Sequence, residues 1–297
     1  MNGVDLQVGA GEVFGLLGPN GAGKTTTLEC LVGLRRPTGG TIRVLGDDPA
    51  VHTEDFRRAV AVQPQEGALF SNLTVRETVE LWASFYPRPD DVDAVIDRVG
   101  LSDEGSRRVK GLSGGQRRRL LLAVTVVGRP KVLVLDEPAA GLDPQARERL
   151  WAVVRKHRED GGTVLLTTHD MTEATELCDR IAVLVDGRIA ACDTPARLVS
   201  ALATTSTVTF RAGSEVALEA LRALPSVTAV EALPYGEGQV TVHVRTTDGD
   251  GTLRRIAADP VLDAKELDVT RGGLEQVFHT LASSDRRDPA GAPGKEV

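Results

Sequence analysis

The stretch Gly18-Pro-Asn-Gly-Ala-Gly-Lys24-Thr25 decides the fold that the sequence predicts, because it matches the pattern GxxxxGK[ST]. An apolar run at residues 13–17 precedes it, and a helical pattern at residues 24–32 follows it. In this strand–loop–helix context, the glycines let backbone N–H groups point inward around a phosphate, and the start of the helix adds its positive end. A Gly-rich turn without a ligand is the simpler alternative, and the context weighs against it.

The loop predicts separate roles for its residues around the phosphates of a bound nucleotide. Lys24 would reach the β- and γ-phosphates, and the hydroxyl of Thr25 would bind Mg²⁺. The residues that we expect to bind the phosphates are Gly18, Pro19, Asn20, Gly21, Ala22, Gly23, Lys24, Thr25 and Thr26.

Around this loop, short apolar runs alternate with longer helical patterns as far as about residue 200, which is typical of an α/β fold with a buried sheet. The runs rich in Val, Leu and Ile predict strands at 13–17, 41–44, 60–62, 132–135, 164–167 and 181–185. Helices are predicted at 24–32, 116–127 and 144–158. The last has Asp143 as its N-cap and Pro144 in its first position.

Two other regions differ in their pattern of apolar and polar residues. Amphipathic patterns at 74–85 and 92–99 predict a helical insert over about residues 66–115 of a main domain that spans residues 1–203. From 204 to 284, strand candidates (207–210, 240–244, 266–269) and helix candidates (216–224, 252–258, 274–281) predict a small α+β accessory domain of order βαββαβ, split-βαβ-like, with one further helix. Residues 285–297 are polar and predict a disordered tail.

Composition limits the class of protein. Hydrophobic residues make up 41% and charged residues 26%, the balance of a soluble protein, and the net charge of −7 argues against general nucleic-acid binding. The longest apolar stretch, residues 120–127, is far shorter than the roughly 20 residues of a membrane span. No leader opens the sequence and its three cysteines form no metal spacing, so we expect a cytoplasmic protein that reaches any membrane through a partner.

A pair of carboxylates follows the apolar run 132–135, which delivers Asp136 and Glu137 to the end of a predicted strand. In a parallel sheet, ligands collect at that end. We expect Asp136 to bind Mg²⁺ and Glu137 to accept a proton from an attacking water. Such a pair often does no more than cap a helix, but the presence of the phosphate loop in the same sequence favours the functional interpretation.

Three further elements are less widespread among phosphate-loop proteins. Ser113, Gly114, Gly115 and Gln116 precede a helix and offer a hydroxyl, backbone amides and a helix N-terminus to an anion. Gln65 stands just before the helical insert. Of the five histidines, only His169 ends a predicted strand, where its imidazole could reach a terminal phosphate.

A basic run, residues 117–119, follows Gln116. On a helix, three consecutive arginines fan over most of the circumference, and the surrounding chain is acidic. We interpret the run as a solvated face rather than as a nucleic-acid site.

With these motifs in this order, and with Ala140-Gly-Leu-Asp143, residues 3–200 resemble the nucleotide-binding subunit of ABC transporters. The resemblance implies a head-to-tail homodimer that holds two ATP molecules with Mg²⁺. One subunit would contribute residues 18–25 and the other residues 113–116 to each ATP. It further implies that Gln65 senses the γ-phosphate and the metal, that His169 contacts the γ-phosphate and that Asp143 lies at the dimer seam.

The segment Gly273-Leu-Glu-Gln-Val-Phe278 resembles the accessory domain of the daunorubicin-resistance type of export ATPase. The resemblance implies an ATPase that powers export of a hydrophobic compound (a drug, an antibiotic or a lipid) through a separate integral-membrane permease, which would contact the helical insert. We expect the accessory domain to strengthen dimerisation or docking. The family also has an aromatic residue that stacks on adenine; here the first aromatic is Phe14, inside a predicted core strand, so no such residue is assigned.

A soluble ABC-type ATPase that acts on DNA or ribosomes is the alternative function. Such proteins generally carry two cassettes, a long coiled-coil insertion or a zinc site. This sequence has one cassette, no heptad run and no CxxC pair, which favours the transporter.

Overall fold

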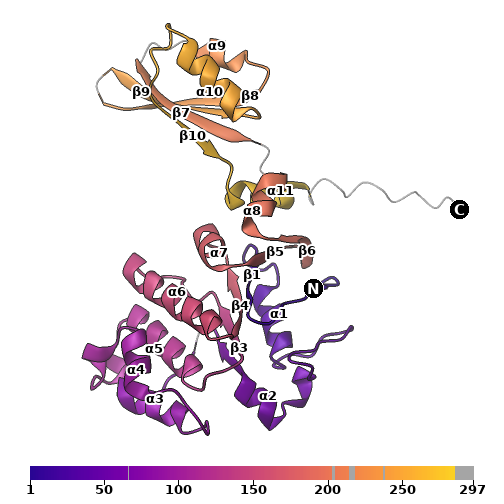
Figure 1. Ribbon diagram of the computed structural model, residues 1–297, viewed down its shortest axis with the longest axis vertical. Helices are drawn as coiled ribbons and strands as arrows, with labels where there is room; N and C mark the ends of the chain where they lie inside the picture. The colour runs from indigo at the N-terminus through magenta and orange to yellow at the C-terminus, as the bar shows by residue number, and fades with distance from the viewer. Residues whose placement is uncertain (66, 203–204, 214–217, 237, 285–297) are drawn as a thin grey trace, which may run out of the picture. The chain divides into compact units, whose positions relative to one another are not determined.

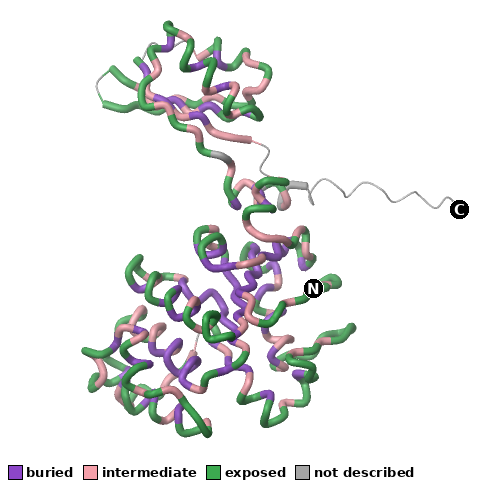
Figure 2. Tube along the Cα trace, in the orientation of Figure 1, coloured by how far each residue is buried: buried purple, intermediate pink, exposed green. Residues whose placement is uncertain are grey.

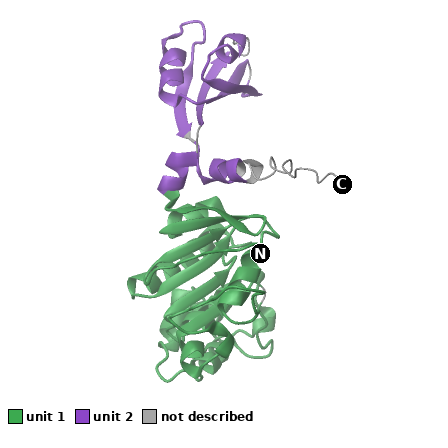
Figure 3. Ribbon diagram, turned by 90° about the vertical axis from the view of Figure 1, so that its right-hand side faces the viewer, with its two compact units in different colours: residues 1–195 green, residues 196–297 purple. Residues whose placement is uncertain are grey.

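The structure is a computed structural model of the 297-residue chain that describes residues 1–65, 67–202, 205–213, 218–236 and 238–284. The chain divides into two compact units, residues 1–195 and 196–297 (Figure 3). The sequence placed the boundary at residue 203, eight residues later, because helix α8 (Pro195–Leu202) groups with the second unit. The expected tail, residues 285–297, lies outside the described residues.

A six-stranded sheet of order β2-β3-β4-β1-β5-β6 forms the centre of the first unit (Figure 1). Its strands are β1 (Val13–Leu17), β2 (Val60–Gln63), β3 (Val132–Asp136), β4 (Thr163–Thr168), β5 (Arg180–Val185) and β6 (Arg188–Asp193). All neighbouring strands pair in parallel except β5 and β6, which are antiparallel. The central strands are continuous runs of buried Val, Leu and Ile because helices cover parallel sheets on both faces.

Two predictions about strands were wrong. Residues 41–44 form no strand and make only an isolated bridge, Val44 with Asp47, because Leu45 and Gly46 take positive φ values and reverse the chain. Strand β6 was missed because its residues alternate between half-buried and exposed rather than forming a buried run. The turn Asp186-Gly187, with φ of 47° and 77°, joins β5 to β6, and this Asp-Gly pair was the available hairpin signal.

The helices of the first unit are α1 (Lys24–Leu31), α2 (Glu54–Ala59), α3 (Val75–Ala83), α4 (Val92–Arg98), α5 (Gly114–Val126), α6 (Pro144–Glu159) and α7 (Met171–Leu177). Several begin at side chains that cap their first N–H groups. Thr74 and Glu77 form a capping box at α3, and Asp143 caps α6 ahead of Pro144, as predicted. Within the described residues, no helix has both the length and the apolar character that crossing a membrane requires.

Buried residues concentrate along the central sheet of the first unit (Figure 2). Phe14 and Leu16 of β1 pack with Val134 of β3, Leu165 of β4 and Leu28 of α1 in one apolar cluster. This cluster fixes the strands relative to α1. As a result, the carboxyl ends of β1, β3 and β4 lie at one edge of the sheet.

The second unit contains an antiparallel sheet of order β10-β7-β9-β8. Its elements after α8 are β7 (Ser206–Gly213), α9 (Leu218–Arg222), β8 (Val227–Pro234), β9 (Gln239–Thr246), α10 (Gly249–Ala258), β10 (Lys265–Arg271) and α11 (Leu274–Ser284). Val208 and Phe210 of β7, Val242 and Val244 of β9 and Ile256 of α10 form its core. The order βαββαβ is the predicted one, but β8 was not among the predicted strand ranges. Residues 216–217 of the predicted first helix lie outside the described residues.

Candidate functional site

The loop between β1 and α1 adopts a shape that requires glycine. Gly21 and Gly23 have φ values of 84° and 104°, in the left-handed region that glycine adopts most easily. A Cβ on Gly18 would lie 2.6 Å from the carbonyl oxygen of Leu184 in β5, so only glycine permits this close approach. The loop therefore delivers Lys24 and Thr25 to the first turn of α1.

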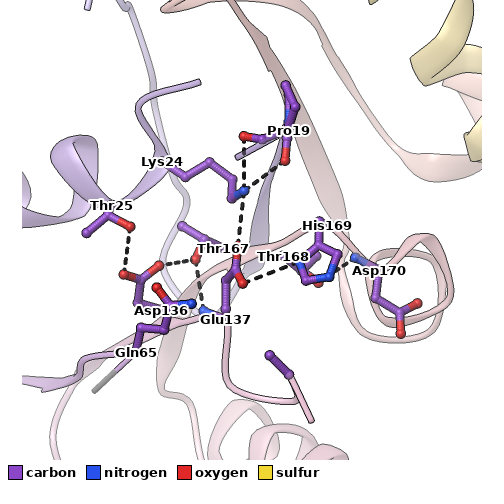
Figure 4. Close-up of polar contacts among 12 residues, drawn as sticks. Pro19, Lys24, Thr25, Gln65, Asp136, Glu137, Thr167, Thr168, His169 and Asp170 are labelled. Carbon is purple, nitrogen blue, oxygen red and sulfur yellow. Dashed lines mark hydrogen bonds and ion pairs between the residues drawn. The ribbon is translucent and has the colours of Figure 1, made fainter. Parts of the chain in front are cut away.

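Lys24 is buried at the centre of a polar network (Figure 4). Its Nζ donates hydrogen bonds to the carbonyl oxygens of Gly18 at 2.8 Å and Pro19 at 3.3 Å. The same Nζ lies 3.1 Å from Oε1 of Glu137, and both side chains are almost fully buried. The cation thus joins the loop to the carboxylate beyond β3.

Asp136 ends β3 and accepts hydrogen bonds on both carboxylate oxygens. Thr25 Oγ1 donates to Oδ2 at 2.9 Å, and Thr167 Oγ1 donates to Oδ1. Asp136 and Thr167 are register partners in the parallel β3–β4 pair, so the sheet itself brings them together. Thr167 is fully buried and was not singled out by the sequence as a site residue. Its position directly before Thr168 and His169, at the end of a predicted strand, could have identified it as a site residue.

Glu137 has a left-handed backbone, with φ of 47°. For a residue other than glycine this costs about 1–3 kcal/mol and occurs where the surroundings fix it. The N–H of Glu137 bonds to the carbonyl oxygen of Thr167 at 3.1 Å and to Thr167 Oγ1 at 3.0 Å. The carboxylate lies next to two nitrogen-bearing side chains, with Lys24 Nζ 3.1 Å from Oε1 and His169 Nδ1 3.3 Å from Oε2.

His169 directly follows β4, and its side chain is 57% exposed. Asp170 then caps α7 by accepting from the N–H groups of Thr172 and Glu173. Burial raises the pKa of Asp170, but these bonds and Arg147, 2.9 Å away, outweigh it and leave that pKa lowered. The charged cap fixes the chain on the far side of His169.

The remaining predicted site residues lie around this network. Gln65 is exposed two residues after Gln63, which pairs with Leu135 in the β2–β3 register, so it lies near the end of β3. Ser113 and Gln116 form a capping box at the start of α5, and Gln116 Nε2 donates to Glu104 Oε1 at 2.6 Å. Asp143 is exposed at the start of α6.

The solvated-face interpretation of residues 117–119 was wrong for two of the three arginines. Arg117 is exposed, but Arg118 and Arg119 are half-buried and donate to backbone carbonyls. Burial lowers the pKa of both guanidinium groups. Because α5 packs against β2 on one side and against α3, α4 and α6 on others, consecutive side chains cannot all reach solvent.

Two oxygen atoms of this network could bind a divalent cation. In the part of the chain that the structure describes, no group of three or more His, Cys, Asp and Glu side chains could hold a metal by itself. Thr25 Oγ1 and Asp136 Oδ2, 2.9 Å apart, offer a hydroxyl and a carboxylate oxygen. This small set suits Mg²⁺, which usually keeps several waters and takes phosphate oxygens as further ligands.

Comparison with known proteins decides the family. Residues 1–140 match the family model described as ABC transporter. Over 307 residues the chain is 36% identical to the daunorubicin/doxorubicin resistance ATP-binding protein DrrA of Streptomyces peucetius, covering 97% of this chain and 89% of that protein. The chain belongs to the ABC transporter ATP-binding family. This ABC ATPase is also 43% identical over 204 residues to the Nod factor export ATP-binding protein I of Burkholderia lata, covering 67% of each.

Solved structures show the same fold for the ABC ATPase. One, an ATP-binding subunit of an ABC transporter, gives a TM-score of 0.60 at 29% identity and covers 65% of this chain and 82% of that one. Another is a dimeric, post-hydrolysis state of an ATP-binding cassette bound to ADP and Pi. It gives a TM-score of 0.59 at 25% identity and covers 64% of this chain and 88% of that one. The predicted family and P-loop fold are therefore confirmed.

Proposed function

We propose that this ABC ATPase hydrolyses ATP to energise efflux of a hydrophobic compound, such as a drug, an antibiotic or a lipid, through a separate membrane permease. The observation that carries the proposal is the joining of Lys24, Asp136 and Glu137 in one buried network at the end of the sheet. The names of two relatives, one for daunorubicin/doxorubicin resistance and one for Nod factor export, support export as the process.

In this proposal, residues 18–26 bind the phosphates of ATP, with Lys24 as the cation at their far end. Thr25, Asp136 and Gln65 hold Mg²⁺. When bound, Mg²⁺ would neutralise charge that develops on the phosphates. The fit rests on the Thr25–Asp136 contact of 2.9 Å and on the left-handed glycines that open the loop to a phosphate.

Glu137 is the proposed general base that accepts a proton from the attacking water. Its carboxylate is 10% exposed, so it is shielded from bulk solvent but still at the surface of the network. Lys24 lies next to one oxygen atom of the carboxylate and His169 next to the other, so the two side chains restrict the direction in which the carboxylate faces. His169, more exposed, is the proposed contact to the terminal phosphate.

We further propose a head-to-tail homodimer in which Ser113–Gln116 of one copy cover the ATP held by the other. Ser113 and Gly114 are exposed at the N-terminus of α5, where backbone N–H groups favour an anion. Asp143, also exposed, would lie at the dimer seam. The dimeric ADP-bound cassette among the similar structures supports this assembly.

The helical insert is the proposed docking site for the permease, which would place the protein on the cytoplasmic face of the membrane. Two large apolar side chains of this region are exposed: Phe70 is 60% and Phe85 is 65% exposed. Phe70 also contacts the ring of Trp82, with centroids 6.1 Å apart. Exposed aromatic side chains of this kind are enriched where proteins meet partners. For the accessory domain, residues 204–284, we propose a role in strengthening the dimer or the docking.

Replacing Glu137 with Gln tests the proposal directly. ATP binding should persist, and turnover should fall by about 10²-fold or more because the general base is lost. Glu159→Gln, at the exposed end of α6, is the matched control and should hydrolyse ATP at the wild-type rate. Near-normal hydrolysis by the Glu137 variant would remove this residue from its role. A purified pair of ATPase and permease that exports nothing with ATP would contradict the transport proposal.

A further inference from the structure

Arg118 leaves the second turn of α5 and ends on the backbone of the loop that carries Glu137. Its Nη2 donates to the carbonyl oxygen of Glu137 at 2.7 Å, and its Nη1 donates to the carbonyl oxygen of Ala140 at 2.7 Å. Nη2 also lies 3.5 Å from the carbonyl oxygen of Gln65. One side chain thus contacts the segments that follow β2 and β3.

The two nearer carbonyls belong to the two ends of one turn. The N–H of Ala140 donates to the carbonyl oxygen of Glu137 at 3.3 Å, which closes a turn over residues 137–140. The planar guanidinium binds the carbonyls at both ends of this turn at once. A lysine, with all its donors on one nitrogen, cannot reproduce this geometry.

The turn needs such a support because Glu137 stands in a left-handed conformation. Thr167 holds the N–H of Glu137 from β4, and Arg118 holds its carbonyl oxygen from α5. The peptide groups on both sides of Glu137 are therefore fixed by different elements. Without Arg118, the carbonyl oxygen of Glu137 would keep only the longer hydrogen bond from the N–H of Ala140, within the turn itself.

Arg118 sits in surroundings that keep it in place. Its side chain is half-buried, and the carboxylates of Glu137, Glu173 and Asp136 favour its charged form against the effect of burial. The start of α5 also packs on the same loop, since a Cβ at Gly115 would lie 3.6 Å from the side chain of Leu142. The arginine and the helix that carries it thus contact one continuous segment, residues 137–142.

We infer that Arg118 is a positioning residue for hydrolysis: its two hydrogen bonds to the turn at residues 137–140 hold Glu137 in its working orientation. The inference rests on the proposed function, because it assigns Glu137 the role of general base. It ties that role to α5, the helix that begins at Ser113–Gln116. The orientation of the base therefore depends on an element outside the phosphate-binding loop.

The test compares Arg118→Ala and Arg118→Lys with Arg117→Ala in the full chain. Arg117 is the adjacent arginine on the same helix and is exposed, so its loss removes equal charge without touching the turn. Each variant is assayed for kcat, for equilibrium binding of a fluorescent ATP analogue and for thermal unfolding. We expect both Arg118 variants to lose about tenfold or more in kcat, with analogue affinity within about threefold of wild type. Arg117→Ala should match wild type.

Three outcomes would overturn the inference. The first is a kcat of Arg118→Ala within twofold of wild type. The second is a loss of analogue affinity and thermal stability that accounts for the loss of kcat, which would make Arg118 merely structural. The third is full rescue by Arg118→Lys, which would show that charge alone suffices. A wild-type chain without ATP hydrolysis would instead contradict the proposed function, so the two failures are distinguishable.

Discussion

Nζ of Lys24 lies 3.1 Å from Oε1 of Glu137, and both side chains are almost fully buried. The two residues stand 113 positions apart in the chain, one after β1 and one after β3. The ion pair therefore reports the register of the sheet, β1 against β4 and β4 against β3. In the proposed mechanism, this cation faces the phosphates and this carboxylate faces the attacking water, so the pair joins binding to chemistry.

Removing the cation should affect binding first. Lys24→Met is expected to weaken nucleotide binding by about tenfold or more, because a charge-assisted hydrogen bond contributes about 1.5–3 kcal/mol. Lys131→Met, at the opposite end of β3 and exposed, is the control. Titration with a fluorescent ATP analogue measures both. Equal affinities of the two variants would refute the role of Lys24.

Thr167 should matter for both stability and turnover. Its hydroxyl donates to Asp136 and accepts from the N–H of Glu137, and it is fully buried. Thr167→Val leaves a buried carboxylate oxygen without this donor, so the free energy of unfolding should fall by about 1–3 kcal/mol. Hydrolysis should fall as well. Thr167→Ser keeps the hydroxyl and should stay near wild type in urea unfolding and in turnover; equal losses in both variants would contradict this account.

The pKa of Glu173 should make stability depend on pH. Burial raises this pKa, although the Trp151 indole N–H, 3.3 Å away, partly offsets the effect. The folded state therefore holds the proton more tightly than the unfolded state, and stability falls as pH rises from the ordinary glutamate pKa through the raised one. Glu173→Gln removes this dependence.

The melting temperature of Glu173→Gln minus that of wild type should consequently become more positive between pH 5 and about pH 8. Glu176→Gln, exposed on the same helix, should show a difference that does not change with pH. A constant difference for Glu173→Gln across the same range would show that this carboxyl does not titrate as inferred.

Gln63 is a buried polar residue whose replacement should stabilise the fold. It ends β2 at 1% exposure, and within the described chain neither its amide nitrogen nor its amide oxygen has a hydrogen-bond partner. Such groups cost about 1–3 kcal/mol, so Gln63→Met should raise the free energy of unfolding by about that amount. Gln145→Met, exposed on α6, should change little in the same denaturant titration. A less stable Gln63→Met would mean that the amide has partners after all.

The sequence predicted the parallel strands β1 to β5 well because they are largely buried runs that strong loop signals delimit. Asp143 and Pro144 likewise marked the start of α6 correctly, since capping is a local interaction. The prediction for residues 41–44 was wrong because the chain reverses at Leu45 and Gly46, so Val44 pairs only with Asp47 and not with a neighbouring strand.

The candidate site was predictable as a set of residues but not as a geometry. Motif spacing identified Lys24 and Glu137 as candidates. Their ion pair depends on the order of the strands, which local sequence patterns do not predict. The left-handed backbone of Glu137 and the inward course of Arg118 arise from packing between distant segments. A run of three arginines looks the same in sequence whether its helix is exposed or buried on several sides.

The central claim is tested most directly by light scattering, which measures the mass in solution of the Glu137→Gln variant with ATP and Mg²⁺. The account predicts a dimer that forms with ATP and Mg²⁺, does not form without nucleotide, and is lost when Ser113 and Gly114 are replaced by bulky residues. A protein that stays monomeric with ATP and Mg²⁺, although it binds the nucleotide, would contradict the shared ATP site on which the proposed function depends.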